Sequence, residues 1–296
     1  MKEPIFTGAG VAIITPMNPD GSINYDEFGK FIDFQIDNGT DAIIVCGTTG
    51  ESSTLEVDEH NEAIRWCVEY VNKRVPVIAG TGSNSTASAI ELSKEACDAG
   101  ADALLIVTPY YNKTSQRGLI AHYTAVHNAT DKPIILYNVP SRTGINIAPE
   151  TARELSKLPR INGIKEASGK LEQVEAVKEL CGDDLYIWSG NDDQIYDLLE
   201  RGGKGVISVL SNIAPQETHD IVAKYLDGDK TGSRQLMDKY MKLAKAMFVD
   251  VNPIPVKEAV SLIGFEAGPL RMPLIEMDET NKAYVKETLK EYGLLK

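Results

Sequence analysis

The stretch INGIKEAS, residues 161–168, holds one lysine, Lys165, inside a short run rich in apolar and small residues. Its length and the turn residues on either side predict a buried β-strand. Burial disfavours the ammonium form, and a neutral lysine amine is a nucleophile toward ketones and aldehydes. The alternative is a structural lysine that reaches solvent or pairs with a carboxylate such as Glu166. The surrounding sequence must decide between the two.

The rest of the chain alternates in the same way between strand-like and helix-like segments. Eight β-rich runs begin roughly 20–33 residues apart, at 11–15, 42–47, 75–82, 101–109, 133–140, 161–168, 185–190 and 205–210. The stretches between them have helical spacing; residues 24–38, for example, carry Phe28, Phe31 and Ile32 and end before Gly39. This alternation predicts an α/β fold, the (β/α)8 TIM barrel.

A helical segment follows the last run. We expect residues 1–214 to form the barrel with its active site, and residues 215–296 to form C-terminal helices that complete the barrel and add a helical appendage. The motifs NPIP (252–255) and RMP (271–273) mark breaks in this segment. Its helices are expected to cover the barrel or to make subunit contacts.

The composition excludes several classes of protein. Among 296 residues, 43% are hydrophobic and 25% are charged, which is ordinary for a soluble globular protein. The sequence has no apolar run of membrane-spanning length and no signal core, so we expect a cytoplasmic protein with no membrane partner. The net charge of −13 disfavours nucleic acid as a partner. An anionic substrate would therefore need local positive groups.

Cysteines and histidines give no sign of a metal centre. The four cysteines are widely spaced and form no CxxC motif, as expected of small buried side chains in a reducing compartment: Cys46, Cys67, Cys97 and Cys181. The four histidines form no HExxH or similar ligand motif. We therefore predict no metal and no cofactor.

Polar and glycine-rich turns follow the strands, at the end where barrel enzymes place their active sites. Gly47-Thr48-Thr49-Gly50-Glu51 follows the second run. Its amides and hydroxyls could hold a carboxylate or a phosphate, and the alternative is a plain turn between strand and helix.

Two other strand ends carry reactive or charged side chains. Tyr137 ends the fifth run and could move a proton, while Arg142 on the following loop offers a planar fork to a carboxylate. The alternatives are a core tyrosine and a solvated arginine. Tyr110 and Tyr111 follow the fourth run and are typical of an interface. Together with Lys165, these groups fit a Schiff base between the lysine and a keto acid, which would become an enamine and attack an aldehyde.

The motifs GTTGES, AGTGSN, TPYYNK, YNVPSRTG, GIKEAS, SGND and NPIPVK together resemble the dihydrodipicolinate synthase family, in the pyruvate-dependent class I aldolase superfamily. The likeness extends along almost the whole chain. It implies a (β/α)8 barrel with C-terminal helices, usually a homotetramer that is a dimer of dimers. The implied reaction condenses pyruvate with L-aspartate 4-semialdehyde to 4-hydroxy-tetrahydrodipicolinate, a lyase reaction on the route to diaminopimelate and lysine.

The resemblance also implies a role for individual residues. The Schiff-base lysine falls on Lys165, and the proton relay falls on Tyr137, Tyr111 and Thr48, with Tyr111 reaching into a neighbouring subunit's site. The pyruvate carboxylate would bind Thr48 and Thr49, and the aldehyde substrate would bind Arg142. Main-chain groups near two further residues would line the pocket, Gly190 and Ile207.

One family feature is altered in this chain. Members that lysine inhibits typically carry a histidine and a glutamate at an interface effector site, and the matching positions here are Val57 and Ser88. His60, Asn84 and Tyr110 of that possible effector site remain. Without an acidic partner for the effector's ammonium, we expect weak inhibition by lysine or none.

Three other functions compete with this interpretation. A related Schiff-base aldolase, such as N-acetylneuraminate lyase or a 2-keto-3-deoxy sugar acid aldolase, would share the lysine but resembles the chain less around Arg142. A barrel that only binds a keto acid, without catalysis, is possible because fold alone does not give function. A metal-dependent aldolase could start from Asp192 and Asp193, but it lacks histidine ligands.

Overall fold

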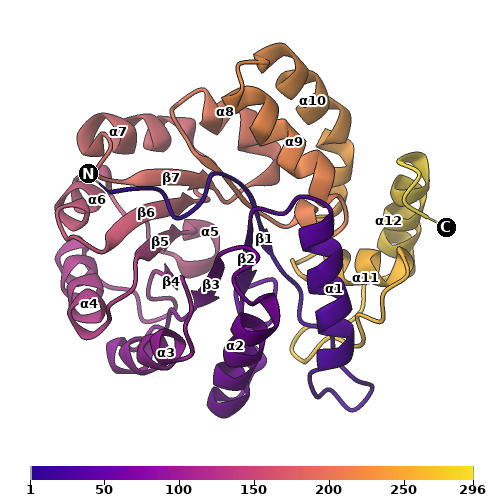
Figure 1. Cartoon of the computed structure of the whole chain (residues 1–296), viewed down its shortest axis with the longest axis horizontal. Helices are drawn as coiled ribbons and strands as arrows, with labels where there is room; N and C mark the ends of the chain where they lie inside the picture. Colours follow the sequence, from indigo (N-terminus) through magenta and orange to yellow (C-terminus); the bar gives the residue numbers. More distant parts are fainter. Residues whose placement is uncertain (1, 296) are drawn as a thin grey trace.

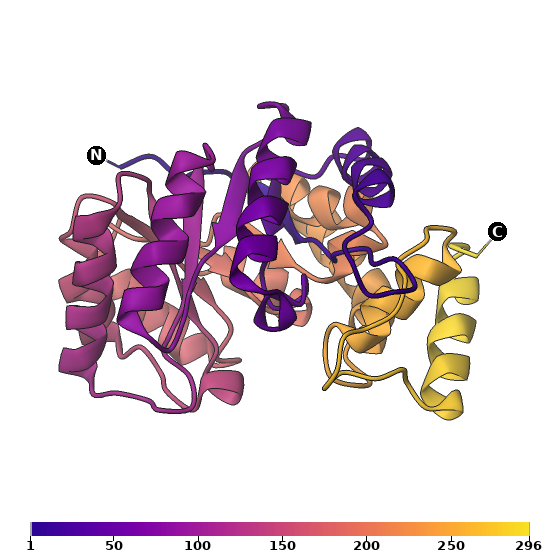
Figure 2. The same cartoon turned by 90° about the horizontal axis from the view of Figure 1, so that it is seen from below.

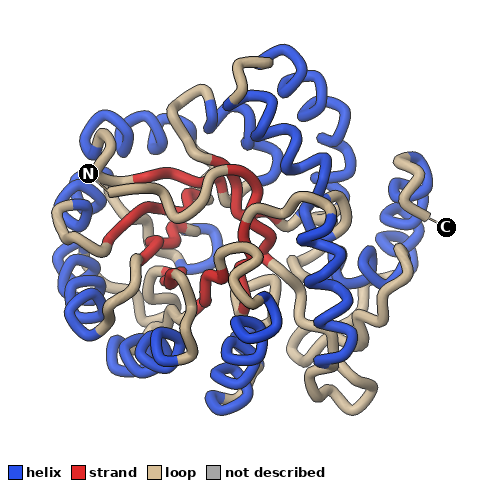
Figure 3. Tube along the Cα trace, viewed as in Figure 1, coloured by secondary structure: helices blue, strands red, loops and turns tan. Residues whose placement is uncertain are grey.

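The computed structural model describes residues 2–295 and shows a closed barrel of parallel strands (Figures 1 and 3). Each strand pairs with the next along the chain, and the eighth closes on the first. The strands are β1 (Gly8–Ala12), β2 (Ala42–Val45), β3 (Val77–Gly80), β4 (Ala103–Val107), β5 (Ile134–Asn138), β6 (Ile161–Glu166), β7 (Tyr186–Ser189) and β8 (Gly205–Ser208). The predicted (β/α)8 barrel is thereby confirmed.

Helices surround the barrel. Those that follow the strands in turn are α1 (Tyr25–Asp37), α2 (Val57–Val71), α3 (Thr86–Asp98), α4 (Gln116–Ala129), α6 (Pro149–Ser156), α7 (Leu171–Cys181), α8 (Ile195–Leu199) and α9 (Pro215–Leu226). A single-turn helix, α5 (Pro140–Thr143), lies in the loop after β5. The chain then forms α10 (Lys230–Ala246), α11 (Ile254–Leu262) and α12 (Glu279–Glu291). Figure 2 shows α11 and α12 at one side of the barrel, as an appended region.

The helix ends follow local sequence signals. The side chains of Asn24, Ser85 and Ser115 each accept a hydrogen bond from a backbone N–H in the first turn of α1, α3 and α4. Gly39 and Gly100 follow α1 and α3 with φ of 84° and 91°, which side chains other than glycine rarely adopt. These caps and stops produce the repeated turn from helix to strand.

The first strand lies earlier than predicted. We expected residues 11–15, but β1 spans Gly8–Ala12. Gly8 and Gly10 are poor strand formers, yet Gly10 pairs with Ala42 on one side and with Ile207 on the other. Beyond the strand, the backbone N–H of Ile14 donates instead to the Asn212 side chain. The bounds of β1 are therefore set by its pairing with β2 and β8, and the low strand propensity of its glycines does not prevent this pairing.

The barrel interior is packed and closed at its N-terminal end. It is filled mainly by apolar side chains from all eight strands and their ends, including Ile44, Ile78, Leu105, Ile135 and Ile207. At the bottom, Phe6 from the N-terminal segment stacks on Trp188 of β7, with ring centroids 5.2 Å apart. These two rings therefore fill the interior at the N-terminal ends of the strands.

The C-terminal region is held to the barrel by a buried ion pair. Lys257 on α11 lies 2.6 Å from the Glu51 carboxylate, and both side chains are almost fully buried. Lys257 also donates to the Pro269 carbonyl. Burial lowers the pKa of the Lys257 ammonium, and the Glu51 carboxylate opposes that change. The pair therefore fastens α11 to the turn that follows β2.

The division into residues 1–214 and 215–296 stays a prediction. Helix α9 belongs to the second segment, yet it packs against β1 as well as α10. Within residues 2–295, no helix is both long and apolar enough to cross a membrane.

Candidate active site

Lys165 points into the barrel from β6. It is 5% exposed and lies in register with Tyr137 of β5 and Trp188 of β7. Its Nζ is 4.4 Å from the centroid of the Tyr137 ring. Among residues 2–295, the lysine takes part in no salt bridge. A strand alternates its side chains between two faces, which places this amine inside the barrel.

Glu166, the next residue, points to the opposite face. Its carboxylate accepts hydrogen bonds from the Asn138 amide at 2.9 Å and from the Ser168 backbone N–H at 2.7 Å. Burial raises the pKa of the Glu166 carboxyl, and these hydrogen bonds oppose the rise. The structural alternative of a Lys165–Glu166 ion pair is therefore not the arrangement seen here.

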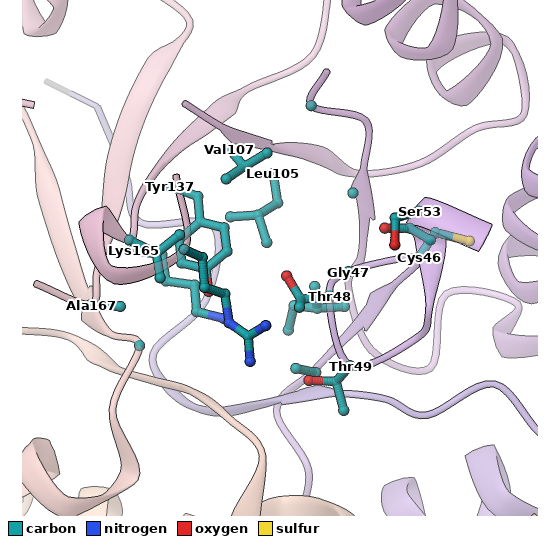
Figure 4. Close-up of a pocket in the computed structure, with 18 of the residues that line it drawn as sticks. Cys46, Gly47, Thr48, Thr49, Ser53, Leu105, Val107, Tyr137, Lys165 and Ala167 are labelled. Carbon is teal, nitrogen blue, oxygen red and sulfur yellow. The ribbon is translucent and has the colours of Figure 1, made fainter. Parts of the chain in front are cut away.

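A cavity of about 610 Å³ lies at the C-terminal ends of the strands. Lys165 and Tyr137 form part of its wall, with Ala12, Leu105 and Val107 supplying apolar surface. Figure 4 shows Thr48 facing Lys165 and Tyr137 across this space. An amine held against apolar walls beside hydroxyl groups can attack a carbonyl group with little competition from water.

The turn after β2 brings Thr48 and Thr49 to the cavity. Its bend places Cys46 and Glu51 in the left-handed region, with φ of 52° and 56°. Thr49 is 2% exposed, and its Oγ1 accepts a hydrogen bond from the Asn252 side chain at 3.1 Å. Since Glu51 is tied to α11, both ends of the turn are fixed. The Thr49 hydroxyl is thus held in place before any ligand binds.

Arg142 and Gly190 complete the predicted lining. Arg142 lies on α5, borders the cavity, and donates through one guanidinium N–H to the main-chain carbonyl of Asn252 at 3.1 Å. Gly190 follows β7, and a Cβ there would lie 2.7 Å from the Ala167 side chain and 3.0 Å from Cε of Lys165. Only a glycine at this position leaves room for the Lys165 side chain in its present conformation.

Two predicted residues lie away from the cavity within this chain. Ile207 is fully buried in β8 and does not border the cavity. Tyr111 is 92% exposed, has a φ of 67°, and does not border it either. A large aromatic side chain held so far out in a strained backbone conformation is suited to an interface.

Some residues of the possible effector site border the cavity and others do not. His60, Tyr110 and Val57 border the outer part of the same cavity, whereas Asn84 and Ser88 do not. The His60 ring lies 2.9 Å from the Gly80 carbonyl, and burial lowers the pKa of its imidazole. The cavity therefore extends from Lys165 toward this group.

Sequence reasoning assigned no part in the Schiff-base chemistry to two buried polar residues, Asp192 and Asn252, and it considered Asp192 only as the start of a metal site. Asp192 is buried, and its carboxylate accepts hydrogen bonds from the backbone N–H groups of Val209 and Leu210. Burial raises the pKa of this carboxyl, whereas those hydrogen bonds and the Lys165 charge lower it. Asn252 borders the cavity from the C-terminal region. It belongs to the NPIP motif, which the sequence showed as a helix break and as part of the family resemblance, without a role at the site.

The residues that the structure describes, 2–295, contain no group of three His, Cys, Asp or Glu side chains placed to hold a metal ion. The arrangement offers a buried amine, two threonine hydroxyls and a guanidinium around one cavity. Such a set can bind the carboxylates of two substrates and form a covalent imine between the amine and a keto group of one of them, with loss of water.

Comparisons with known proteins support this chemistry. A family model described as the dihydrodipicolinate synthetase family matches residues 5–292. The 4-hydroxy-tetrahydrodipicolinate synthases of Lachnoclostridium phytofermentans and Clostridium perfringens strain SM101 are 56% and 55% identical over 292 residues, covering 98–99% of this chain and 99–100% of each relative. A crystal structure of the chloride-inhibited dihydrodipicolinate synthase from Acinetobacter baumannii, complexed with pyruvate, has a TM-score of 0.96 at 41% identity. It covers 98% of this chain and 99% of that one.

Proposed function

Because this chain belongs to the dihydrodipicolinate synthetase family, we propose that it is a 4-hydroxy-tetrahydrodipicolinate synthase. It condenses pyruvate with L-aspartate 4-semialdehyde through a Schiff base on Lys165, in the biosynthesis of diaminopimelate and lysine. The observation that carries the proposal is the unpaired amine of Lys165 in a cavity that Thr48, Thr49 and Arg142 also border. It works in the cytoplasm and needs no cofactor.

The reaction begins at the Lys165 amine. The amine adds to the C2 carbonyl of pyruvate, and loss of water leaves an iminium ion, whose positive nitrogen withdraws electrons from the neighbouring methyl group. That methyl group loses a proton to give an enamine. Thr48 and Thr49 hold the pyruvate carboxylate, and Tyr137 and Thr48 carry protons to and from the reacting atoms.

The second half of the reaction joins the two substrates. Arg142 holds the carboxylate of aspartate semialdehyde, which directs the aldehyde carbon toward the enamine. The enamine carbon attacks this aldehyde carbon, and the resulting alkoxide takes a proton to become the hydroxyl group. The substrate's amino group then adds to the imine carbon and displaces Lys165. Ring closure thus regenerates the free lysine, and one water is released overall.

The proton relay draws on a second copy of the chain. Tyr111, 92% exposed here, reaches into the cavity of a neighbouring subunit, and main-chain groups near Gly190, which borders the cavity, contact the bound pyruvate. We expect a homotetramer built as a dimer of dimers, in which each cavity receives this tyrosine from its partner.

Borohydride reduction in the presence of pyruvate tests the covalent step. A reduced pyruvyl adduct on Lys165, found by peptide mass spectrometry, is the expected result, and the Lys165→Arg variant supplies the control without an adduct. Turnover of both substrates, measured with and without a chelator, tests the full reaction. A folded, pyruvate-saturated protein that forms no adduct would exclude the mechanism.

A further inference from the structure

We propose that Asn252 is a positioning residue for substrate binding, and that it sets the direction in which the Thr49 hydroxyl donates its hydrogen. The inference rests on the proposed function, since it concerns the carboxylate of the keto acid. Asn252 lies between α10 and α11, outside the eight barrel strands, and it borders the cavity. It is 6% exposed.

The inference depends on which atom donates in the hydrogen bond between Asn252 and Thr49. The side-chain N–H of Asn252 donates to Oγ1 of Thr49 at 3.1 Å. A hydroxyl has one hydrogen to donate and two lone pairs that accept. Because Asn252 occupies a lone pair, the hydrogen of Thr49 remains free for an acceptor in the cavity. An anion such as a carboxylate is the strongest acceptor that could fill that position.

The main chain of the same residue holds the second anion-binding group. The carbonyl oxygen of Asn252 accepts a hydrogen bond from the Arg142 guanidinium at 3.1 Å. One residue of the C-terminal region therefore contacts both groups that we assign to substrate carboxylates. Substitution of the side chain removes the contact with Thr49 and leaves the carbonyl beside Arg142, so the two contacts can be tested separately.

The fixed position of Asn252 depends on the ion pair described above. Lys257, one turn into α11, is joined to Glu51, which lies two residues after Thr49 in the turn that follows β2. The C-terminal region thus meets this turn at two neighbouring points. A contact made by one hydrogen bond alone would be free to rotate, whereas two contacts fix the relative position of the amide and the hydroxyl.

The test compares Asn252→Ala with Asn252→Asp. The alanine variant removes the hydrogen bond that orients the Thr49 hydroxyl. We therefore expect the KM for pyruvate to rise about 3- to 10-fold. The aspartate variant accepts the Thr49 hydrogen and adds a negative charge, so the KM should rise about 10- to 100-fold. The KM for the aldehyde should stay within about threefold of wild type in both, since the carbonyl beside Arg142 is retained.

The control is Asn72→Asp, which makes the same change at an exposed residue in the left-handed conformation after α2. It should leave both KM values unchanged. The aspartate variant should regain affinity for pyruvate as the pH falls and the new carboxyl takes up a proton, because a protonated carboxyl can donate to Thr49. A purely structural role would not produce this recovery.

Borohydride trapping separates this proposal from the function on which it rests. The pyruvate concentration that gives half-maximal adduct on Lys165 should shift by the same factors as the KM, without any aldehyde present. Absence of an adduct in the wild-type protein would defeat the proposed function. Two results would overturn the role of Asn252 if the wild-type protein traps pyruvate. In the first, both variants need the same pyruvate concentration as wild type for half-maximal adduct. In the second, the alanine variant needs a higher concentration than the aspartate variant.

Discussion

Lys165 and Arg142 border the same cavity from adjacent strand ends, and they divide the binding of two substrates between them. The lysine captures the keto acid covalently and does not need Arg142 for that step. The arginine, held by the Asn252 carbonyl, has its remaining N–H groups available for a second carboxylate. At this scale, each residue should therefore affect a different step.

Arg142→Ala should reduce kcat/KM for aspartate semialdehyde by about 100-fold, because a charge-assisted pair with the substrate carboxylate is lost. Formation of the pyruvyl adduct on Lys165 should stay close to wild type. Steady-state kinetics and borohydride trapping on the same preparation measure the two effects. Arg117→Ala, at an exposed position on α4, is the matched control. Equal loss of turnover and adduct would contradict the role assigned to Arg142.

Inhibition by lysine should be weak or absent, because the family resemblance matches Val57 and Ser88 to the positions where inhibited members carry a histidine and a glutamate. His60 lies in the cavity with a pKa that burial lowers, so near neutral pH it adds no charge. Half-maximal inhibition in a steady-state assay should need more than millimolar lysine. Ser88→Glu should strengthen inhibition about 10-fold, whereas Ser88→Gln should not. Submillimolar inhibition of the wild type would refute this prediction.

At the scale of elements, the sequence was informative about strands and much less so about contacts between distant segments. Helix caps such as Asn24 and Ser85, and the motif around Lys165, depend on neighbours in sequence, so they could be predicted. The contact between Thr49 and Asn252 joins residues 203 positions apart, and the Glu51–Lys257 pair joins residues 206 apart. No local pattern encodes such pairs, because packing of α11 on the barrel creates them.

Lys257→Met should destabilise the fold by about 3–5 kcal/mol, since it leaves the buried Glu51 carboxylate without its partner. Chemical denaturation measures the change, and Lys286→Met on the exposed side of α12 is the control. The double variant Glu51→Gln with Lys257→Met should be more stable than Lys257→Met alone, because the isolated charge is gone. A single variant within about 1 kcal/mol of wild type would show that the pair does not fasten α11.

For the whole molecule, the fold places a complete set of anion-binding groups in one chain but leaves Tyr111 outside its own cavity. The proposed role of Tyr111 in a neighbouring subunit's cavity comes from the family resemblance alone, and nothing in the residues around it indicates which cavity it would enter. An interface is a property of two chains, and the sequence signal for it was only a pair of adjacent tyrosines.

Subunit mixing tests the position of Tyr111. Tyr111→Phe and Lys165→Ala should each lose most activity alone. Refolded together at equal amounts, half of the dimers combine the two chains, and one of their two cavities then has both residues. Activity should therefore return to about a quarter of wild type. If Tyr111 served its own chain, mixing would give no recovery.

The stacked rings of Phe6 and Trp188 block the barrel interior near the N-terminal ends of the strands. We therefore expect substrates to reach Lys165, and products to leave, through the cavity at the C-terminal ends of the strands. If both substrates share this entrance, we expect the small keto acid to bind first and the aldehyde to bind above it. An aldehyde that arrives early would bar the way, so excess aldehyde should slow the reaction and added pyruvate should relieve the block.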